Sequence, residues 1–307
     1  MNILVIGVGS IALKHITALR QHHPAASVKA LRSSHHAPAY EGVENVYAWD
    51  EVMAGTKPDF VIISNPTQLH EQSITQALSL NCPLFIEKPV LSDTQNADIL
   101  QQQITEKNII TYVACNLRFH PALQFIREYL GTNRREINEV NIYCGSYLPD
   151  WRPATDFRKV YSANKEMGGG VHLDLIHEID YCNWIFGTPQ QTLALKRNAS
   201  SLDIDATDFA AYRLIYEKFT ANITLNYYRR DSKREMEIVT AADTFRVDLL
   251  KGTVTAVLED KLLFETATTI KDTYPLQMNY FIQHITEQKQ PMNSFAEAVE
   301  VLKIAIA

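Results

Sequence analysis

The sequence predicts an α/β domain with a doubly wound parallel sheet, followed by an α+β domain with a mostly antiparallel sheet. Up to residue 117, short apolar runs alternate with helix-length segments, which is typical of a parallel sheet covered by helices. After residue 117, strand-like segments follow one another without helices between them, as in an antiparallel sheet. The length of 307 residues fits two domains, because domains average about 150 residues. We therefore expect one domain at residues 1–117 and another at 118–307.

The first apolar run, ILVI at residues 3–6, has the length of a strand buried on both faces. It is followed at once by GVGSIA, a G-x-G-x-x-A pattern, and then by an amphipathic helical pattern. Gly7 permits a tight turn, Gly9 lets a pyrophosphate approach the backbone, and Ala12 lets the helix pack close to the strand. Free N–H groups at the helix start, where Ser10 and Ile11 lie, would then hold the phosphates. A purely structural turn is the alternative, but the flanking strand and helix favour dinucleotide binding.

The remaining elements of the first domain continue this alternation. Further strands are expected at residues 27–31, 46–49, 60–63, 83–86 and 109–115, and helices at residues 72–80 and 92–107. Ser92 and Gln95 have the spacing of a capping box, which predicts the start of the last helix. Ligands of such sheets bind at the carboxyl ends of the strands. Four candidate residues fall there, namely Gly7, Asn65, Lys88 and Asn116.

The end of the second expected strand carries information about the cofactor. An NAD-binding protein places an acid there, about 20 residues past the glycines, to bind the ribose 2′-hydroxyl. This chain has Arg32 and Ser33 instead of an acid. A guanidinium binds phosphate bidentately and a serine hydroxyl can donate to it, so the pair suits the 2′-phosphate of NADP. A solvated arginine at a strand end is the alternative, and we expect NADP in preference to NAD.

The second domain is expected to open with a helix at residues 121–130, closed by Gly131, and a long strand at residues 136–147. A glycine triplet then leads into a helix at residues 171–186. Strand-like segments are expected to dominate from residue 191 to about residue 268, among them residues 211–216, 219–228, 236–240 and 244–249. Amphipathic helices at residues 274–288 and 295–307 close the sequence, and we expect them to pack back on the first domain.

Composition and charge exclude several classes of function. The net charge is −6 and no run of five Lys or Arg residues occurs, which argues against binding to nucleic acid. No apolar run approaches the roughly 18 residues of a membrane span, so we expect a soluble protein in the cytoplasm. The four cysteines include no C-x-x-C pair and the ten histidines show no metal-ligand spacing. We therefore expect reduced thiols and no metal.

A lysine at the end of an expected strand is the first candidate for catalysis. Glu87, Lys88 and Pro89 follow the strand at residues 83–86, and the proline turns the chain there. An ammonium group in that position can hydrogen-bond a substrate hydroxyl and stabilise negative charge as its proton leaves. A surface lysine paired with Glu87 is the alternative, but the position at a strand end favours function.

Residues 168–180, GGGVHLDLIHEID, form a second candidate. Three glycines let the backbone come close to a ligand. Asp174, His177 and Asp180 are spaced by three, so an acid, an imidazole and an acid would lie along one helix face. Such a histidine can act as a general acid or base near neutral pH, with one carboxylate holding its tautomer. A hydrogen-bonded core histidine in a capped helix is an equal alternative.

The loop at residues 147–161 is the third candidate, because it is rich in aromatic and charged side chains. Aromatic faces with arginine suit a polyhydroxylated or carboxylated ligand, although packing between domains would use the same residue types. The candidate substrate-binding residues of this loop are Tyr147, Trp151, Arg152 and Arg158.

Taken in order, these motifs resemble those of the glucose-fructose oxidoreductase, inositol dehydrogenase and MocA (Gfo/Idh/MocA) oxidoreductase family over nearly the whole chain. The resemblance is carried by GVGSIA, N-P-T-x-x-H at 65–70, EKP at 87–89, NLRFHP at 116–121 and the glycine-led helix. It implies a Rossmann domain plus an open-faced sheet domain, use of NAD or NADP, and redox chemistry at a sugar or cyclitol carbon. It also implies a homodimer or homotetramer built on that sheet.

The resemblance implies roles for individual residues as well. Lys88 would be the catalytic lysine, His177 the acid/base and Asp174 a substrate ligand. The residues around the cofactor would include Asn65, Pro66, His70, Glu87, Lys88 and Asn116. The family commonly separates the aspartate from the histidine by four positions, whereas three separate them here. The D-L-x-H-E-x-D form, preceded by Y-L-P-D-W-R-P, resembles members associated with bacterial surface-sugar synthesis.

Two other functions stay open at this point. One is a cofactor-binding sensor without turnover, as some relatives of the family are, although such a protein would not need Lys88 and His177. The other is a reductase of non-sugar substrates such as dihydrodiols or linear tetrapyrroles. A larger, more apolar cleft would indicate the latter.

Overall fold

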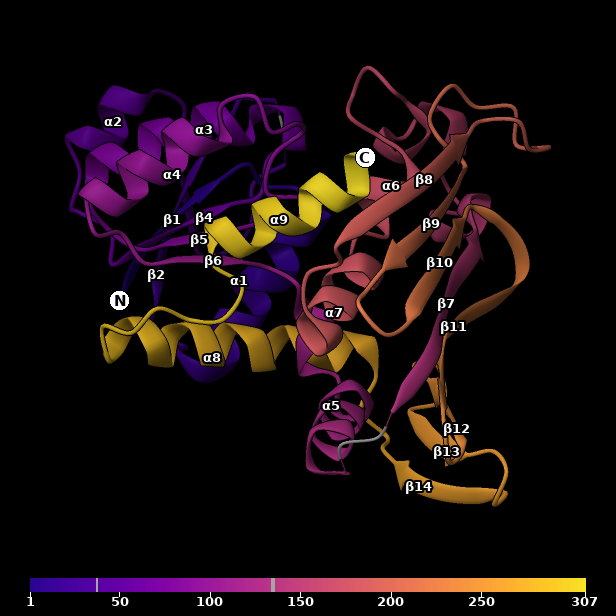
Figure 1. The fold of residues 1–307 in the computed structure, drawn as a ribbon. Coiled ribbons are helices and arrows are strands. Elements are labelled where there is room, and N and C mark those ends of the chain that lie inside the picture. The colour runs from indigo at the N-terminus through magenta and orange to yellow at the C-terminus, as the bar shows by residue number, and fades with distance from the viewer. Residues whose placement is uncertain (37, 134–135) are drawn as a thin grey trace. The chain divides into compact units, whose positions relative to one another are not determined.

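The computed structural model describes residues 1–307 except 37 and 134–135 (Figure 1). The chain divides into two compact units. The first consists of Met1–Cys115 and Tyr274–Leu302, and the second of Asn116–Thr273 and Lys303–Ala307. The first unit is therefore built from two stretches that lie far apart in the sequence.

The first unit contains a six-stranded parallel sheet in the order β3-β2-β1-β4-β5-β6. Its strands are β1 (Asn2–Ile6), β2 (Ser27–Leu31), β3 (Val43–Val46), β4 (Phe60–Ile63), β5 (Leu84–Ile86) and β6 (Thr111–Val113). Its helices are α1 (Ser10–His22), α2 (Trp49–Met53), α3 (His70–Ala77), α4 (Ala97–Glu106), α8 (Thr273–Thr286) and the first part of α9 (Phe295–Ile306). In Figure 1, α1 and α8 lie on one face of this sheet and α3 and α4 on the other. The predicted doubly wound parallel sheet is confirmed.

Helices on both faces explain why the central strands read as continuous apolar runs. Every residue of β4 is 0% exposed, because neither face of this strand meets water. On the face covered by α8, the ring of Phe281 packs edge-on against Phe60 and Phe85, with ring centroids 5.2 and 5.3 Å away. The core therefore fills the faces of the sheet, and the ends of its strands carry the polar side chains.

One helix start in the first unit was predicted wrongly. The helix expected from residue 92 begins at Ala97, as α4. The Ser92 hydroxyl donates to the Asp93 carboxylate, and Oδ1 of Asp93 accepts the backbone N–H of Gln95 at 2.9 Å. Asp93 thus accepts the Gln95 N–H that the Ser92 oxygen would accept in a capping box, and the chain forms a local turn before the helix.

The second unit contains an eight-stranded sheet in the order β14-β13-β12-β11-β7-β10-β9-β8. Its strands are β7 (Ile137–Tyr147), β8 (Gln191–Arg197), β9 (Phe209–Ile215), β10 (Thr220–Asn226), β11 (Tyr228–Thr240), β12 (Thr244–Asp248), β13 (Thr253–Ala256) and β14 (Lys261–Glu265). All described neighbours run antiparallel except β7 and β10, which are parallel. The predicted mostly antiparallel sheet is confirmed.

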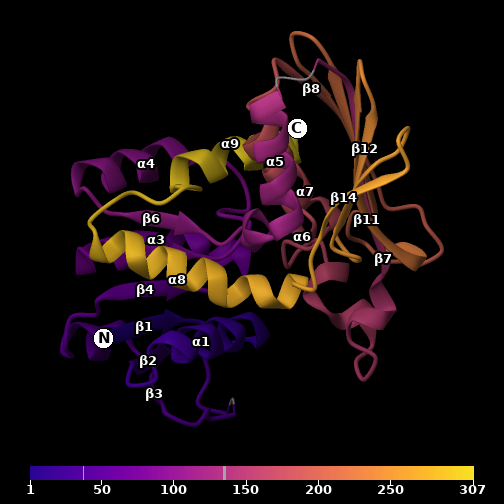
Figure 2. The same cartoon turned by 90° about the horizontal axis from the view of Figure 1, so that it is seen from below.

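Besides the end of α9, the described part of this unit holds three α-helices, namely α5 (Pro121–Asn133), α6 (Val171–Asp174) and α7 (His177–Phe186). Short 3-10 helices in the chain include Thr67–Leu69, Asn116–Phe119, Leu148–Trp151, Phe157–Lys159, Tyr161–Ala163 and Ile270–Asp272. Seen from below in Figure 2, the three α-helices lie on one face of the sheet. The prediction that Gly131 closes α5 was wrong, because the helix continues to Asn133. Gly131 keeps helical backbone, and a helix interior tolerates a glycine at a cost of about 1 kcal/mol.

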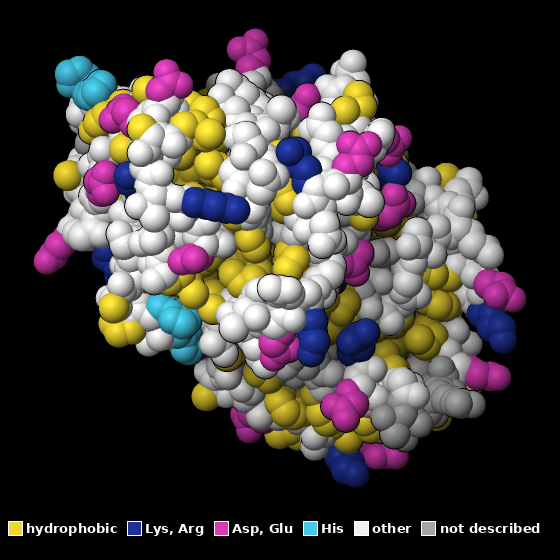
Figure 3. Space-filling view, turned by 90° about the vertical axis from the view of Figure 1, so that its left-hand side faces the viewer, with side chains coloured by type: hydrophobic (Ala, Val, Ile, Leu, Met, Phe, Trp, Pro, Cys, Tyr) yellow, Lys and Arg dark blue, Asp and Glu magenta, His cyan; other side chains and the backbone are white. Residues whose placement is uncertain are grey.

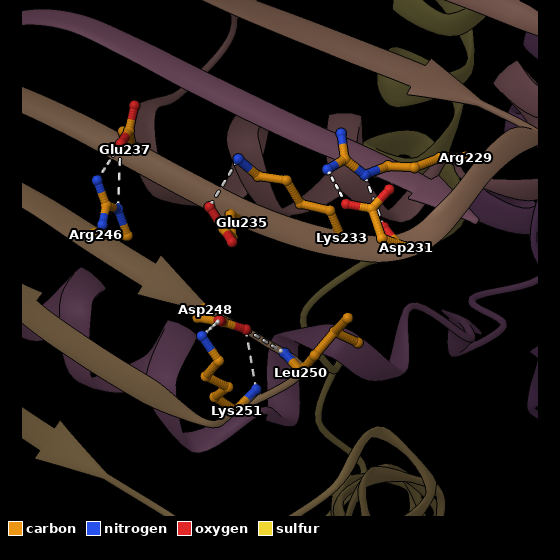
Figure 4. A network of polar contacts seen from close by, with 9 residues as sticks. All are labelled: Arg229, Asp231, Lys233, Glu235, Glu237, Arg246, Asp248, Leu250 and Lys251. Atoms are coloured by element: carbon orange, nitrogen blue, oxygen red, sulfur yellow. Dashed lines mark hydrogen bonds and ion pairs between the residues drawn. The ribbon is translucent and has the colours of Figure 1, made fainter.

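The opposite face of the eight-stranded sheet carries polar side chains. In β10, Ala221, Ile223 and Leu225 are 0% exposed and alternate with half-buried polar residues. On β11 and β12 the outward side chains form ion pairs such as Lys233 with Glu235 and Arg246 with Glu237 (Figure 4). This period of two is the pattern of a sheet with a single covered face.

No helix among the described residues is both long and apolar enough to span a membrane. On the coloured part of the surface in Figure 3, Lys and Arg side chains lie singly among acidic ones and form no continuous basic area.

Candidate functional site

The turn between β1 and α1 has the geometry of a phosphate-binding loop. Gly7 has φ +83°, and a Cβ there would lie 2.6 Å from the Cα of Asn65, so only glycine fits. A Cβ at Gly9 would meet nothing within 4 Å. No side chain caps α1, and its first turn holds no acid. The N–H groups at the start of α1, around Ser10 and Ile11, thus have no side-chain cap and lie next to the open space at Gly9, which fits the pyrophosphate of a dinucleotide.

The loops after β4 and β5 come together around the buried ring of His70. Its Nε2 lies 3.0 Å from the carbonyl oxygen of Asn65, and its Nδ1 lies 3.0 Å from that of Pro89. The Ser64 hydroxyl also donates to the carbonyl oxygen of Gly7 at 2.9 Å. Burial lowers the pKa of His70, and the hydrogen bonds with the backbone of Asn65, Val90 and Pro89 partly oppose this shift. His70 thus fixes the loops at the strand ends, and direct contact with a cofactor stays a prediction for both His70 and Pro66.

Glu87 is buried and bonded to a histidine that the sequence interpretation did not single out. Nε2 of His15, on α1, hydrogen-bonds Oε1 of Glu87, and Oε2 of Glu87 accepts the backbone N–H of Lys88 at 3.0 Å. Glu87 is therefore buried and bonded to His15 and to the Lys88 backbone, which differs from the alternative of a surface pair with Lys88. His15 lies on the same helical face as Ala12, Ile16 and Leu19, and this placement is the signal that could have found it.

Arg32 is more constrained than a strand-end arginine in solvent would be. The side chain is buried, and its Nη1 donates to the carbonyl oxygen of Pro38 at 2.6 Å and to Oδ1 of Asn45 at 3.3 Å. Ser33 is exposed beside it. The guanidinium is therefore oriented by neighbouring loop and strand residues, and its Nη1 is already hydrogen-bonded within the protein.

The helix expected at residues 171–186 is two helices, so the single helical face predicted for Asp174, His177 and Asp180 was wrong. Asp174 ends α6 and His177 begins α7, and the backbone between them leaves the helical path at Leu175, where ψ is +30°. Asp180 is held by an arginine, since both its oxygens accept from Arg118, at 2.7 and 2.9 Å. Glu178 is held in the same bidentate way by Arg234.

Asp174 has a partner in Tyr227, a residue that sequence reasoning missed. The Tyr227 hydroxyl donates to Oδ2 of Asp174 at 2.5 Å. Burial and the nearby Asp174 carboxylate raise the pKa of Tyr227, so the phenol keeps its proton. The ring of Trp151 lies edge-on to Tyr227, with centroids 5.4 Å apart. The only sequence signal that could have identified Tyr227 was its position directly after the end of a strand.

The other predicted residues of the second unit are placed less closely together. The Tyr147 ring lies under the guanidinium of Arg230, 3.6 Å from ring centroid to Cζ. Arg152 and Arg158 are exposed, and Arg158 lies over Phe157. Asn116 is buried, and its amide donates to the Thr273 hydroxyl at 2.6 Å. Contact of these residues with a ligand stays a prediction.

No group of three or more His, Cys, Asp or Glu side chains in the described part of the chain could hold a metal ion.

Residues 1–115 match the model of a family described as an oxidoreductase family with an NAD-binding Rossmann fold. In these residues the chain is similar to the NAD-binding domain of the Gfo/Idh/MocA oxidoreductases. The glycine loop, the loop with Asn65 and the strand end with Lys88 all lie within the matched range.

Several proteins that this chain resembles are named as dehydrogenases of sugars or cyclitols. The inositol 2-dehydrogenase of Rhizobium meliloti is 24% identical over 96% of this chain and 88% of its own length. A levoglucosan dehydrogenase in complex with NADH has a similar fold, with a TM-score of 0.86, 16% identity and coverage of 100% of this chain and 95% of that one. For the UDP-N-acetylglucosamine 3-dehydrogenase of Acidithiobacillus ferrooxidans the TM-score is 0.77, at 20% identity and the same coverage. The chain spans about half the length, 53% and 55%, of the first curated relatives that it matches.

Proposed function

We propose that this protein is an NAD(P)-dependent oxidoreductase that transfers hydride between nicotinamide and a carbon of a sugar, sugar derivative or cyclitol. The start of α1 carries the proposal, since its uncapped N–H groups next to the open space at Gly9 suit a pyrophosphate. Lys88, at the end of β5 in the same unit, supports it further. The relatives named as inositol and levoglucosan dehydrogenases support the substrate class.

In this proposal the protein's residues bind the substrate and move its proton. The nicotinamide, when bound, supplies the hydride acceptor or donor. Lys88 hydrogen-bonds the reacting hydroxyl and stabilises the negative charge that develops there. His177 takes the hydroxyl proton in oxidation and returns it in reduction. Asp174, oriented by Tyr227, binds a further hydroxyl of the substrate.

NADP is the preferred cofactor in this proposal. No acidic side chain follows β2, and Arg32 stands there with Ser33. Since Nη1 of Arg32 is held by Pro38 and Asn45, a 2′-phosphate would bind through the other guanidinium nitrogens. Arg32→Ala should therefore weaken NADPH binding by about tenfold or more and leave NADH binding nearly unchanged. Tighter binding of NADH than of NADPH by the unaltered protein would contradict this preference.

We also propose a cytoplasmic homodimer or homotetramer that joins copies through the uncovered face of the eight-stranded sheet. The four cysteines are free and buried, as is usual in a reducing compartment. Leu193 and Leu195 on the edge strand β8 are 50% and 54% exposed and point to the uncovered side. Light scattering should show an oligomer, and Leu195→Lys should shift it toward monomer. A monomer at micromolar concentration would overturn this part of the proposal.

Titration calorimetry of nucleotide-free protein with NADPH and NADH, followed by a turnover screen, tests the function. The screen would include sugars, nucleotide sugars and cyclitols. We expect binding of at least one nucleotide and turnover of at least one substrate. Binding of neither nucleotide would contradict the proposal at its base. Tight binding without any turnover would favour a sensor that does no chemistry.

A further inference from the structure

The segment after β5 is held on two sides by buried histidines from two different helices. On one side, His15 of α1 bonds Glu87, and its side chain is 0% exposed. On the other, Nδ1 of His70, from α3, lies 3.0 and 3.2 Å from the carbonyl oxygens of Pro89 and Val90. Lys88 stands between the two held positions. Its backbone is thus fixed by residues that come from outside its own strand.

Glu87 connects His15 to Lys88. One carboxylate oxygen is used by the His15 ring and the other by the backbone N–H of Lys88. The backbone N–H of Glu87 donates to the carbonyl oxygen of Ile63 at 2.8 Å, which ties the residue to β4. Burial alone would raise the pKa of Glu87, but the hydrogen bond with His15 and the charges of His15 and Lys88 lower it. The carboxylate is therefore charged near pH 7 and accepts both hydrogen bonds.

The His15 ring is itself held in one orientation. It packs edge-on against Phe85 of β5, with centroids 4.8 Å apart, and lies 5.8 Å from the ring of Tyr274. These two ring contacts favour the orientation in which Nε2 faces the carboxylate. His15 also lies on the helix whose first turn would bind the cofactor, so one rigid element serves both tasks.

We propose that His15 is a positioning residue for Lys88 and acts through the Glu87 carboxylate. The catalytic role of Lys88 rests on the function proposed above. The two hydrogen bonds that connect His15 to the Lys88 backbone through Glu87 do not depend on that function. Displacing a catalytic group by about 1 Å can cost about 10²-fold in rate, so a lysine on a strand end needs such a support. His15 touches neither substrate nor cofactor in this role.

The kinetic test uses His15→Ala, His15→Asn and His15→Gln, with His22→Gln as the matched control at an exposed histidine of the same helix. The glutamine amide nitrogen occupies the place of Nε2 and can still donate to Glu87, whereas the asparagine amide is too short. We expect kcat to fall about 10- to 100-fold in His15→Ala and His15→Asn, and to recover to within about threefold in His15→Gln. The dissociation constant of the cofactor should change little. A loss confined to cofactor binding, or equal losses in all three variants, would overturn the proposal.

A second measurement is independent of turnover. Hydrogen exchange of the Lys88 amide, resolved by NMR or by fragmentation mass spectrometry, reports its bond to Glu87 directly. We expect exchange at least about tenfold faster in His15→Ala and His15→Asn than in the unaltered protein, and near-normal exchange in His15→Gln. Unchanged exchange in His15→Ala would overturn the proposal. If no substrate is turned over, the proposed function fails while this measurement still decides the role of His15.

Discussion

The parallel sheet of the first unit and the mostly antiparallel sheet of the second differ in how many of their faces are covered. In β4 every residue is 0% exposed, because helices cover both faces. In β10 the buried residues alternate with half-buried polar ones. In the central strand β4 of the first unit, polar side chains are therefore absent until the strand ends, whereas in the second unit they extend over a whole face of the sheet.

This difference determines how each unit supports its candidate residues. In the first unit, Lys88 follows a strand and is held by backbone contacts and by buried histidines. In the second, Asp174 and His177 lie at the break between two helices on the covered side of the sheet. Arginines hold the acidic residues Glu178 and Asp180 that follow. The first unit thus supports Lys88 through the strand end and two histidines from helices, and the second uses ion pairs between arginines and the carboxylates of α7.

The largest expected effect is at the strand end of the first unit. Lys88→Ala should lower kcat by about 10³-fold or more, because it removes the charge that stabilises the developing alkoxide. Cofactor affinity should stay within about threefold, since the N–H groups of α1 are untouched. Lys107→Ala, at the end of α4, is the matched control. Steady-state kinetics with calorimetric titration of the cofactor measure both quantities, and near-full activity of Lys88→Ala would remove the lysine from the mechanism.

The difference in the number of covered sheet faces can be tested by paired substitutions in one strand of each sheet. Ile62 and Ile63 point to opposite faces of β4 and are both 0% exposed. Ile62→Ala and Ile63→Ala should each lower the free energy of unfolding by about 2–5 kcal/mol. In β10, Ile223→Ala should lower the free energy of unfolding by the same amount, whereas Thr224→Ala should change it by no more than about 0.5 kcal/mol. Urea unfolding measures these values, and a large loss in Thr224→Ala would mean that a second copy covers that face.

Both sheets could be predicted from the sequence because their patterns are local. Continuous apolar runs indicate strands with two covered faces, and alternation indicates strands with one. Helix ends were predicted less well, since they depend on competing hydrogen bonds such as those of Asp93. The bonds from His15 to Glu87 and from Tyr227 to Asp174 span 72 and 53 residues. Only the packing of the whole unit brings such pairs together, and no local pattern predicts it.

A smaller effect is expected from pH in the second unit. Burial and the charge of Lys196 lower the pKa of His172 to about 4. An unfolded histidine titrates near pH 6.5, so between about pH 6.5 and 4 the unfolded chain binds the extra proton and stability falls as pH falls. The glutamine of His172→Gln cannot titrate. The free energy of unfolding of this variant should therefore fall by about 2 kcal/mol less than that of the unaltered protein over this pH range. Denaturant unfolding at several pH values, with His22→Gln as control, measures the difference, and parallel pH curves would contradict it.

The smallest effect is expected at the hydroxyl that orients Asp174. Tyr227→Phe removes the 2.5 Å bond to Asp174 and should lower kcat/KM by about tenfold, since a half-buried carboxylate can recover part of the loss from water. Tyr216→Phe, which removes a hydroxyl bonded to the carbonyl oxygen of Gly187, is the matched control and should keep full activity. If Tyr227 acts through Asp174, adding Tyr227→Phe to Asp174→Ala should cost almost nothing more. Additive losses would show that the two residues act separately, and the second unit would then lack the paired support that distinguishes it from the strand end at Lys88.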